Sequence, residues 1–482
     1  MTTFHPSHAT LEELDAHFAA VFRGAPELAP DPRMHDYQLT YPPAIQLEQE
    51  AYARAPTPEE YVADGVGALR DAGYYFHFGF CRYRCAYCHH YEIAIRPKDE
   101  VVERHVEAMI AEARRHRELA PGLRPCVTFL GGGTPTAIPL ASIERFLAGH
   151  LDVLGPPASA LSTFEAKPIT ATAEKLAAFR AAGFDRCSMG AQTLDPALYA
   201  RLHHGEDVGE VRAALERARA AGITWLNLDL MVGLEGETLD SVERTLEETR
   251  ALVAAGLLDS AFVYPYHDDP RSRTWSARDR CPTWASTAYA EARARAMFDA
   301  LGWVEFGPRF FRSPAHIRRE VEELARLGVV PAYGETAWIG FGNSAYSVGD
   351  RATWLDHRGL DDYATRALDG RLPISHFTRL TPAQQAARDV SFAVLYAPFV
   401  GWGTIADKYG AETVAGFAST FRRWASLGLG EVNDDWRTFT LSHTGRLVHQ
   451  QMLPALYLTA DRALFDATLR RRASLGRMWK GY

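Results

Sequence analysis

The stretch that decides the fold is residues 74–88, which read Tyr-Tyr-Phe-His-Phe-Gly-Phe-Cys-Arg-Tyr-Arg-Cys-Ala-Tyr-Cys. An apolar β-type run leads directly into a loop in which Cys81, Cys85 and Cys88 fall within eight residues. Three thiolates so close together can hold three irons of a 4Fe–4S cube. Most such sites use four protein thiolates, so the fourth iron would be left for another ligand. The sequence therefore predicts a cluster with one open position.

Two other uses of these cysteines have to be weighed. Zinc normally takes four nitrogen or sulfur ligands, and His89 or His90 could complete such a set. A disulfide framework is disfavoured, because six cysteines in 482 residues are sparse and no basic-then-apolar leader opens the chain. We therefore expect a reducing, cytoplasmic location. The remaining cysteines are scattered and are expected to be packing residues: Cys126, Cys187 and Cys281.

Composition limits the classes of protein to consider. A chain of 482 residues with 47% hydrophobic and 23% charged residues predicts a globular protein of two or three domains. A net charge of −8 argues against a nucleic-acid partner, which would require a basic face. No apolar run is long enough to span a membrane, so no membrane partner is expected.

Between residues 74 and 265, short apolar runs alternate with amphipathic stretches. The predicted strands are Tyr74–Phe78, Cys126–Leu130, Leu161–Glu165, Arg186–Met189, Trp225–Met231 and Ala261–Tyr264. Helical spacing follows most of them, as in Thr172–Ala182, Glu210–Ala221 and Leu239–Ala255. Six strand–helix units in series predict an α/β fold with a parallel sheet and helices outside.

Polar or glycine-rich motifs follow the predicted strands, where parallel β/α folds place active-site groups. Residues 131–135, Gly-Gly-Gly-Thr-Pro, follow the second strand, and their backbone could closely approach a ligand. Glu165 ends the third strand, Gln192 follows the fourth, and Asp229 lies inside the apolar fifth, where it needs a partner. Each also has an ordinary structural explanation. The glycines could form a turn, Glu165 could be a solvated residue at the sheet edge, and Asp229 could make a structural hydrogen bond within the barrel.

Taken together, these motifs resemble the radical SAM superfamily, and in particular its HemN-like branch. The shared elements occur in the same order: the cysteine motif, residues 131–135, 164–168, 188–192 and 227–234. The resemblance implies that S-adenosylmethionine (SAM) occupies the open iron and is reductively cleaved to a 5′-deoxyadenosyl radical. It also implies an electron donor such as flavodoxin or ferredoxin, and an open, TIM-like (β/α)6 barrel in place of a closed eightfold one.

The resemblance also assigns roles to individual residues. It implies that Cys81, Cys85 and Cys88 are the metal ligands. The residues implied to bind cluster-bound SAM are Tyr75, Gly131, Gly132, Gly133, Thr134 and Glu165. Matching positions in the family contact a second SAM molecule, which here would be bound by Gln192 and Asp229.

The expected domains follow from the same pattern. Residues 1–60 are expected to form an N-terminal arm and residues 61–300 the radical SAM core barrel. Residues 301–374 form a connecting region with a Gly-rich run at 338–347. Residues 375–482 resemble the mostly helical C-terminal domain of HemN, with a wing-like pattern at 428–441.

The chain departs from the family at several places. Gly79 stands where the family has Pro, and His204 where it has an Arg that often binds the second SAM's carboxylate. Glu235-Gly236 replaces Pro-Gly. Residues 333–338 replace the haem-binding element of the haem-chaperone relatives, and His89-His90-Tyr91 differs from the porphyrinogen decarboxylases.

These departures favour a class C radical SAM methyltransferase or cyclopropanase that uses two SAM molecules on an sp2 carbon of a small-molecule natural product. Such a reaction needs a base. The candidate bases lie at or near predicted strand ends: His204, Tyr264, His267 and Tyr346. Three alternatives remain: oxygen-independent coproporphyrinogen III dehydrogenase-type decarboxylation, haem handling, and a non-catalytic cluster protein.

Overall fold

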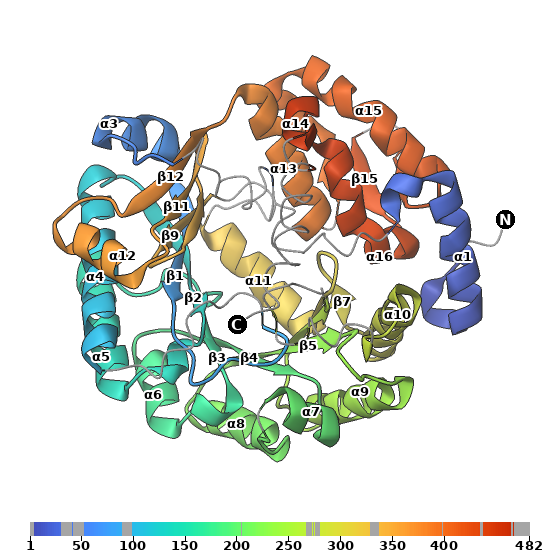
Figure 1. Ribbon diagram of the computed structural model, residues 1–482, viewed down its shortest axis with the longest axis horizontal. Helices are drawn as coiled ribbons and strands as arrows, with labels where there is room; N and C mark the ends of the chain where they lie inside the picture. Colours follow the sequence, from blue (N-terminus) through green and yellow to red (C-terminus); the bar gives the residue numbers. More distant parts are fainter. Residues whose placement is uncertain are drawn as a thin grey trace, which may run out of the picture.

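The strands curve into an open ring with helices on its outside (Figure 1). The computed structural model describes residues 4–29, 41, 53–88, 99–203, 205–266, 272, 274, 280–327, 337–397, 399–433, 437–463 and 466. Within these ranges, one 12-stranded sheet runs in the order β12-β11-β10-β9-β1-β2-β3-β4-β5-β6-β8-β7. The alternating sequence pattern predicts the parallel α/β centre of this sheet. The partial-barrel form is the one that the family resemblance implies.

The six predicted strands are confirmed as the parallel centre of the sheet. Each observed strand overlaps its predicted range, and neighbours pair in sequence order from β1 to β6. Their bounds are β1 Asp71–Phe78, β2 Arg124–Gly132, β3 Thr163–Ala166, β4 Arg186–Gln192, β5 Trp225–Val232 and β6 Ser260–Pro265. Their carboxyl ends therefore share one edge of the barrel.

Six further strands extend both edges of this parallel centre. On the β6 side, β8 (Phe310–Arg312) and β7 (Val304–Glu305) are antiparallel. On the β1 side, β9 (Trp338–Phe341) is parallel to β1 and is followed by antiparallel strands. These are β10 Tyr346–Val348, β11 Ala352–Asp356 and β12 Ile374–Arg379. Residues 301–374, expected as a connection, thus contribute to the same sheet.

Strand β1 shows how the sequence separates the two faces of the sheet. Side chains alternate along a strand, and Tyr74, Phe76 and Phe78 are fully buried under the outer helices. Tyr75 and His77 face the barrel interior and are half-buried. The outer helices are α4 Asp99–Leu119, α5 Leu140–Leu154, α6 Ala173–Ala181, α7 Pro196–Leu202, α8 Gly209–Ala220, α9 Leu239–Ala254, α10 Trp284–Ala300 and α12 Leu360–Leu368.

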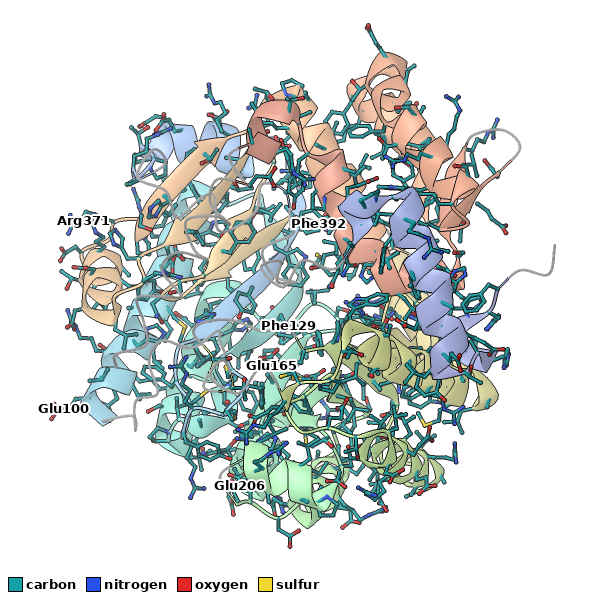
Figure 2. The ribbon with its side chains drawn as sticks, turned by 45° about the vertical axis from the view of Figure 1, so that its right-hand side comes forward. Glu100, Phe129, Glu165, Glu206, Arg371 and Phe392 are labelled. Carbon is teal, nitrogen blue, oxygen red and sulfur yellow. The ribbon has the colours of Figure 1, made fainter. Side chains whose placement is uncertain are left out.

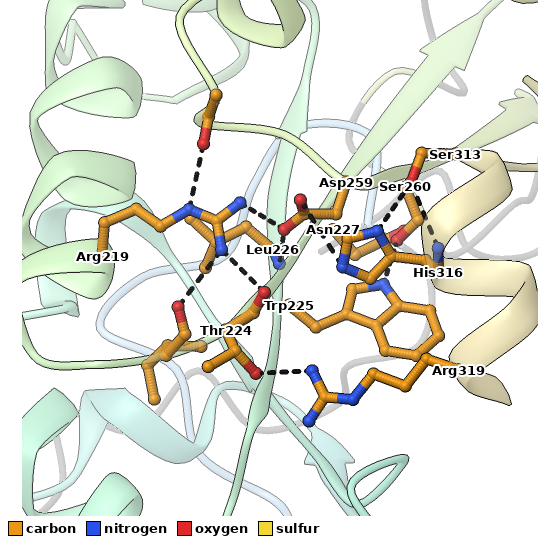
Figure 3. Close-up of polar contacts among 12 residues, drawn as sticks. Arg219, Thr224, Trp225, Leu226, Asn227, Asp259, Ser260, Ser313, His316 and Arg319 are labelled. Carbon is orange, nitrogen blue, oxygen red and sulfur yellow. Dashed lines mark hydrogen bonds and ion pairs between the residues drawn. The ribbon is translucent and has the colours of Figure 1, made fainter. Parts of the chain in front are cut away.

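Helix α11 (Pro314–Leu327) covers the amino-terminal ends of the central strands. Its Leu324 packs with Leu161 and Trp225, which lie at the starts of β3 and β5. Figure 3 shows the polar anchor of this contact, where His316 Nε2 lies 3.6 Å from Asp259 Oδ1. The barrel is therefore closed at this end, and ligands have to enter from the other.

The C-terminal region forms a second apolar core. Helix α1 (Leu11–Gly24) packs into it through Leu14, Phe18 and Val21, so the N-terminal helix and the C-terminal helices share one core. Its other elements are α13 Pro382–Tyr396, α14 Trp402–Tyr409, α15 Ala411–Ser426, α16 His443–Met452, β13 Val400–Gly401, β14 Gly430–Val432 and β15 Thr438–Leu441. These helices lie across the open side of the ring (Figure 1).

No helix in the ranges that the structure describes is long and apolar enough to cross a membrane.

Candidate active site

A cavity of about 150 Å³ lies at the carboxyl ends of the central strands. It combines residues that the sequence separates by up to about 150 positions. Its walls include all three cysteines of the motif, two glycines and both predicted acids: Cys81, Cys85, Cys88, Gly133, Gly190, Glu165 and Asp229. Figure 2 shows Glu165 near the centre of the molecule, next to Phe129 of β2. The sequence motifs therefore do converge on one place.

The cysteine loop begins where β1 ends and is tied to the loop after β2. The amide of Gly133 donates to the Phe78 carbonyl (2.7 Å), and the amide of Thr134 donates to the Phe80 carbonyl (2.7 Å). The Thr134 hydroxyl also contacts Cys81 Sγ at 3.5 Å. The first metal-ligand candidate is thus positioned by the glycine loop.

Among the residues that the structure describes, no three His, Cys, Asp or Glu side chains are gathered closely enough to hold one metal ion. The three cysteines face one cavity, but they do not form a preformed site. Burial raises the pKa of the Cys81 thiol to about 11. Metal binding would have to deprotonate this thiol and draw the sulfurs together, as is common where binding is coupled to local folding. The cysteines' role as ligands stays a prediction.

The glycines of residues 131–133 are required by close packing. A β-carbon at Gly131 would lie 2.9 Å from Glu165 Oε2, and one at Gly133 would lie 2.4 Å from the Phe80 carbonyl oxygen. Gly132 has φ +102°, a conformation that favours glycine. The amides of Gly133 and Thr134 are not free to meet a ligand, because both donate to the end of the neighbouring chain segment.

Glu165 and Asp229 are carboxyls in a low-dielectric cavity. Burial, together with the nearby Asp229 charge, raises the pKa of Glu165 to about 8. Burial raises the pKa of Asp229 to about 6, although it accepts hydrogen bonds from Ser188 Oγ (3.0 Å) and Asn227 Nδ2 (2.9 Å). The partner expected for Asp229 is therefore present. Two such acids favour a cationic ligand, whose charge would stabilise both carboxylates.

Gln192 lies at an irregular point of β4. The pairing with β5 shifts register between Gly190 and Gln192, and Gln192 has φ +65°. Positive φ is uncommon outside glycine, and strained residues of this kind gather at functional sites. With its side-chain amide nitrogen facing the Tyr87 hydroxyl and the carbonyls of Gly190 and Ala191, Gln192 donates to the Tyr87 hydroxyl at 3.0 Å. The bulge thus directs this side chain toward the cysteine loop.

Sequence reasoning missed the residues that surround Cys85. Lys167 Nζ lies 3.1 Å from Cys85 Sγ and 2.5 Å from the Tyr83 hydroxyl. His203 Nδ1 lies 3.9 Å from the same sulfur. Lys167 and His203 are only 9% and 0% exposed. Nothing in the local sequence marks them, because an isolated lysine or histidine normally reads as a surface or packing residue.

Neither of the two predicted bases that the structure describes lines this cavity. Tyr264 on β6 and Tyr346 on β10 are both half-buried and are not among the residues lining it. His204 and His267 lie outside the described residues. Tyr75, predicted to bind SAM, faces the barrel interior, and its hydroxyl lies 3.0 Å from His77 Nδ1. The identity of the base stays a prediction.

The donor set fits the ligands that the resemblance implies. Thiols line one side of the cavity, as an iron–sulfur cluster requires. The buried carboxyls of Glu165 and Asp229 suit a cation such as a sulfonium or ammonium group. Arg82, Arg84 and Lys167 also line the cavity and could pair with a carboxylate.

Comparisons with known proteins agree with this geometry. The Radical SAM superfamily profile matches residues 75–249. The heme chaperone HemW of Bacillus subtilis is 25% identical over 79% of this chain and 98% of its own length. The oxygen-independent coproporphyrinogen III oxidase of Salmonella typhimurium is 24% identical over 91% of this chain and 97% of its own length.

Among solved structures, the coproporphyrinogen III oxidase HemN of Escherichia coli shares the fold. Its TM-score is 0.72 at 23% identity, over 87% of this chain and 96% of that one. The similarity therefore extends beyond the barrel into the C-terminal helices.

Proposed function

We propose that the chain is a radical SAM enzyme of the HemN/HemW type, with a 4Fe–4S cluster and SAM as cofactors, and that it starts a radical reaction on a small molecule inside the barrel. One observation carries this proposal. The cysteine loop, the glycine loop, Glu165 and Asp229 line a single cavity at the open end of the barrel. A cluster that served only as a structural element would have no need of the acidic and glycine walls.

Different groups of residues have different roles in the proposed reaction. When bound and reduced, SAM on a cluster of this kind supplies a 5′-deoxyadenosyl radical that removes a hydrogen atom from carbon. Cys81, Cys85 and Cys88 hold the irons. Glu165, with backbone carbonyls of the glycine loop, would bind and orient the amino-acid and ribose parts of the cofactor. The barrel, closed by α11 at its other end, excludes water from the reacting groups.

Oxidative decarboxylation of the coproporphyrinogen III type is the first candidate reaction. It is supported by two relatives named oxygen-independent coproporphyrinogen III oxidase, which align with 80% and 91% of this chain. It is also supported by the three cationic side chains on the cavity wall, Arg82, Arg84 and Lys167, which suit a substrate that carries carboxylates. A low-potential donor of the flavodoxin or ferredoxin kind would deliver the electron.

Methyl or methylene transfer is the second candidate, in which a second SAM molecule is the carbon donor to an sp2 carbon of a natural product. It is supported by a second polar group on β4 and β5, made of Ser188, Gln192 and Asp229. The sequence departures at His89-His90-Tyr91 and at residues 333–338 also favour it over the porphyrinogen and haem-handling reactions.

One anaerobic experiment separates these candidates. The cluster is reconstituted, SAM and dithionite are added, and 5′-deoxyadenosine and S-adenosylhomocysteine are quantified with and without coproporphyrinogen III. Deoxyadenosine coupled to release of CO₂ from coproporphyrinogen III supports the first candidate. Deoxyadenosine together with S-adenosylhomocysteine, with deuterium from methyl-labelled SAM appearing in deoxyadenosine, supports the second.

Absence of both products from a chain that carries an intact cluster would refute the proposal of an enzyme and favour a binding protein. A matched Glu165→Gln variant serves as the control. It keeps the shape of the side chain but removes the carboxylate, and it should lower deoxyadenosine formation at least tenfold while retaining the cluster.

A further inference from the structure

Lys167 is a buried cation directly beside one of the predicted metal ligands. Its Nζ lies 3.1 Å from Cys85 Sγ and 3.7 Å from the centroid of the Tyr83 ring, and the residue is 9% exposed. Its backbone is fixed by the short helix that begins at Pro168, since its carbonyl accepts from the amides of Thr170 and Ala171. The ammonium group is thus held in place rather than mobile in solvent.

The chemistry of the neighbours makes Lys167 a donor to this sulfur. A lysine ammonium group carries three N–H donors and no acceptor. His203 also faces Cys85, but its Nε2 lies 3.1 Å from the Ala191 carbonyl oxygen, which can only accept. A neutral His203 therefore carries its proton on Nε2, so its Nδ1 cannot donate to a thiolate. Lys167 thus places a cationic donor in contact with Cys85 Sγ.

The surroundings hold this charge in the cavity. Lys167 Nζ donates to the Tyr83 hydroxyl, which in turn donates to the Glu206 carboxylate. Figure 2 shows Glu206 closer to the edge of the molecule than Glu165. The chain of contacts runs from the half-buried Glu206 through Tyr83 to the ammonium group and ends at the sulfur.

We propose that Lys167 raises the reduction potential of the cluster held by Cys81, Cys85 and Cys88, through its hydrogen bond to the sulfur of Cys85. This inference rests on the proposed function. Reduction adds one electron, taken from the low-potential donor protein or from dithionite, to a cluster that already carries negative charge. A cationic donor stabilises the reduced state more than the oxidised one, and hydrogen bonds to cluster sulfurs are a known determinant of potential. Burial strengthens the effect because the local dielectric is low.

A merely structural role for Lys167 predicts something different. If the side chain only fixed Tyr83 and the cysteine loop, its removal would change stability or cluster content and leave the midpoint potential of the remaining cluster unchanged. The measured potential therefore separates the two roles.

The test is an EPR-monitored redox titration of the reconstituted full-length chain. Lys167→Met removes the donor and its charge, and Lys167→Arg keeps both. Lys175→Met is the matched control, because Lys175 donates to the Thr136 carbonyl nearby (2.7 Å) without contacting a cysteine. We expect Lys167→Met to lower the midpoint potential by at least about 59 mV. For one electron, this shift corresponds to a tenfold decrease in the ratio of reduced to oxidised cluster at a fixed potential.

Lys167→Arg should restore most of the wild-type potential, and Lys175→Met should match the wild type. A Lys167→Met potential equal to that of Lys175→Met overturns the inference and leaves the proposed function intact. Wild-type chain that assembles no four-iron cluster overturns both. If Lys167→Met holds too little iron to titrate, the midpoint potential of Lys167→Gln is compared with that of Lys175→Met instead. The amide of Gln keeps a donor but loses the charge, so it should give an intermediate shift.

Discussion

Gly133→Ala tests the packing of the glycine loop against the start of the cysteine loop. A β-carbon at this position would lie 2.4 Å from the Phe80 carbonyl oxygen and 2.8 Å from that of Phe78. Both obstacles are backbone atoms, so no side-chain rotation can relieve the contact. The backbone of one loop has to move away from the other.

The expected loss in the free energy of unfolding follows from the hydrogen bonds that this movement breaks. The amides of Gly133 and Thr134 donate to those two carbonyls at 2.7 Å, and each such hydrogen bond contributes roughly 1 kcal/mol net. Overpacking itself typically costs about 1–3 kcal/mol. We therefore expect Gly133→Ala to lower the free energy of unfolding by about 3 kcal/mol, from a total that is roughly 5–15 kcal/mol for a domain.

The assay is urea denaturation of the metal-free chain followed by circular dichroism, with Gly122→Ala as the matched control. A β-carbon at Gly122 meets nothing within 4 Å, so this variant should unfold within about 0.5 kcal/mol of the wild type. Equal unfolding free energies for the two alanine variants would refute the argument. After reconstitution, Gly133→Ala should also bind less iron, because the loop carrying Cys81 is displaced.

Three further variants probe the ligands, a buried acid and a buried ion pair. Cys85→Ser should lose most bound iron and sulfide in anaerobic analysis, whereas Cys126→Ser, on β2 away from the cavity, should keep both; equal iron in the two would exclude Cys85 as a ligand. Burial raises the pKa of Glu112 to about 7 from an ordinary 4.5, so the folded chain keeps a proton that the unfolded chain loses, and stability should fall as the pH rises through this window. Glu112→Gln should flatten that fall in denaturation at pH 5 and pH 8, and the exposed Glu118→Gln on the same helix should not. Arg295→Met should cost about 3 kcal/mol in urea denaturation, because it removes a buried guanidinium that pairs with both Glu291 and Glu305; a loss below about 1 kcal/mol would contradict this.

The parallel centre of the barrel could be predicted from sequence because its short apolar runs alternate with helical patterns. Trp225–Met231, for example, is a mostly apolar run followed, after a glycine, by a helical pattern, and both elements were found. Strands β7 and β11 each adjoin another strand in the chain without a helix between them, so no strand–helix alternation marks them. They exist because the sheet edges at β1 and β6 offer unpaired backbone groups, which is a tertiary effect.

The candidate site likewise contains some residues that could be predicted from the sequence and others that could not. Glu165 and Asp229 could be predicted because their positions at or near strand ends follow from the local pattern. Lys167, two residues after Glu165, could not, although its Nζ lies 3.1 Å from Cys85 Sγ. Its burial depends on Tyr83 and on the turn at Pro168, and neither contact leaves a mark in the spacing of the sequence.

The reaction is harder to predict than the cofactors for a related physical reason. Cofactor contacts come from consecutive strand ends, so their order along the chain is fixed and short motifs preserve it. Substrate contacts come from whichever side chains face the barrel interior, and here these include half-buried aromatic rings on separate strands: Tyr75 on β1, Phe129 on β2 and Tyr264 on β6. Nothing constrains the sequence distance between such residues, and each reads locally as an ordinary strand residue. The side chains at these positions can therefore change without any change in the cysteine, glycine and acidic motifs, and for this reason the motifs predict the cofactors rather than the substrate.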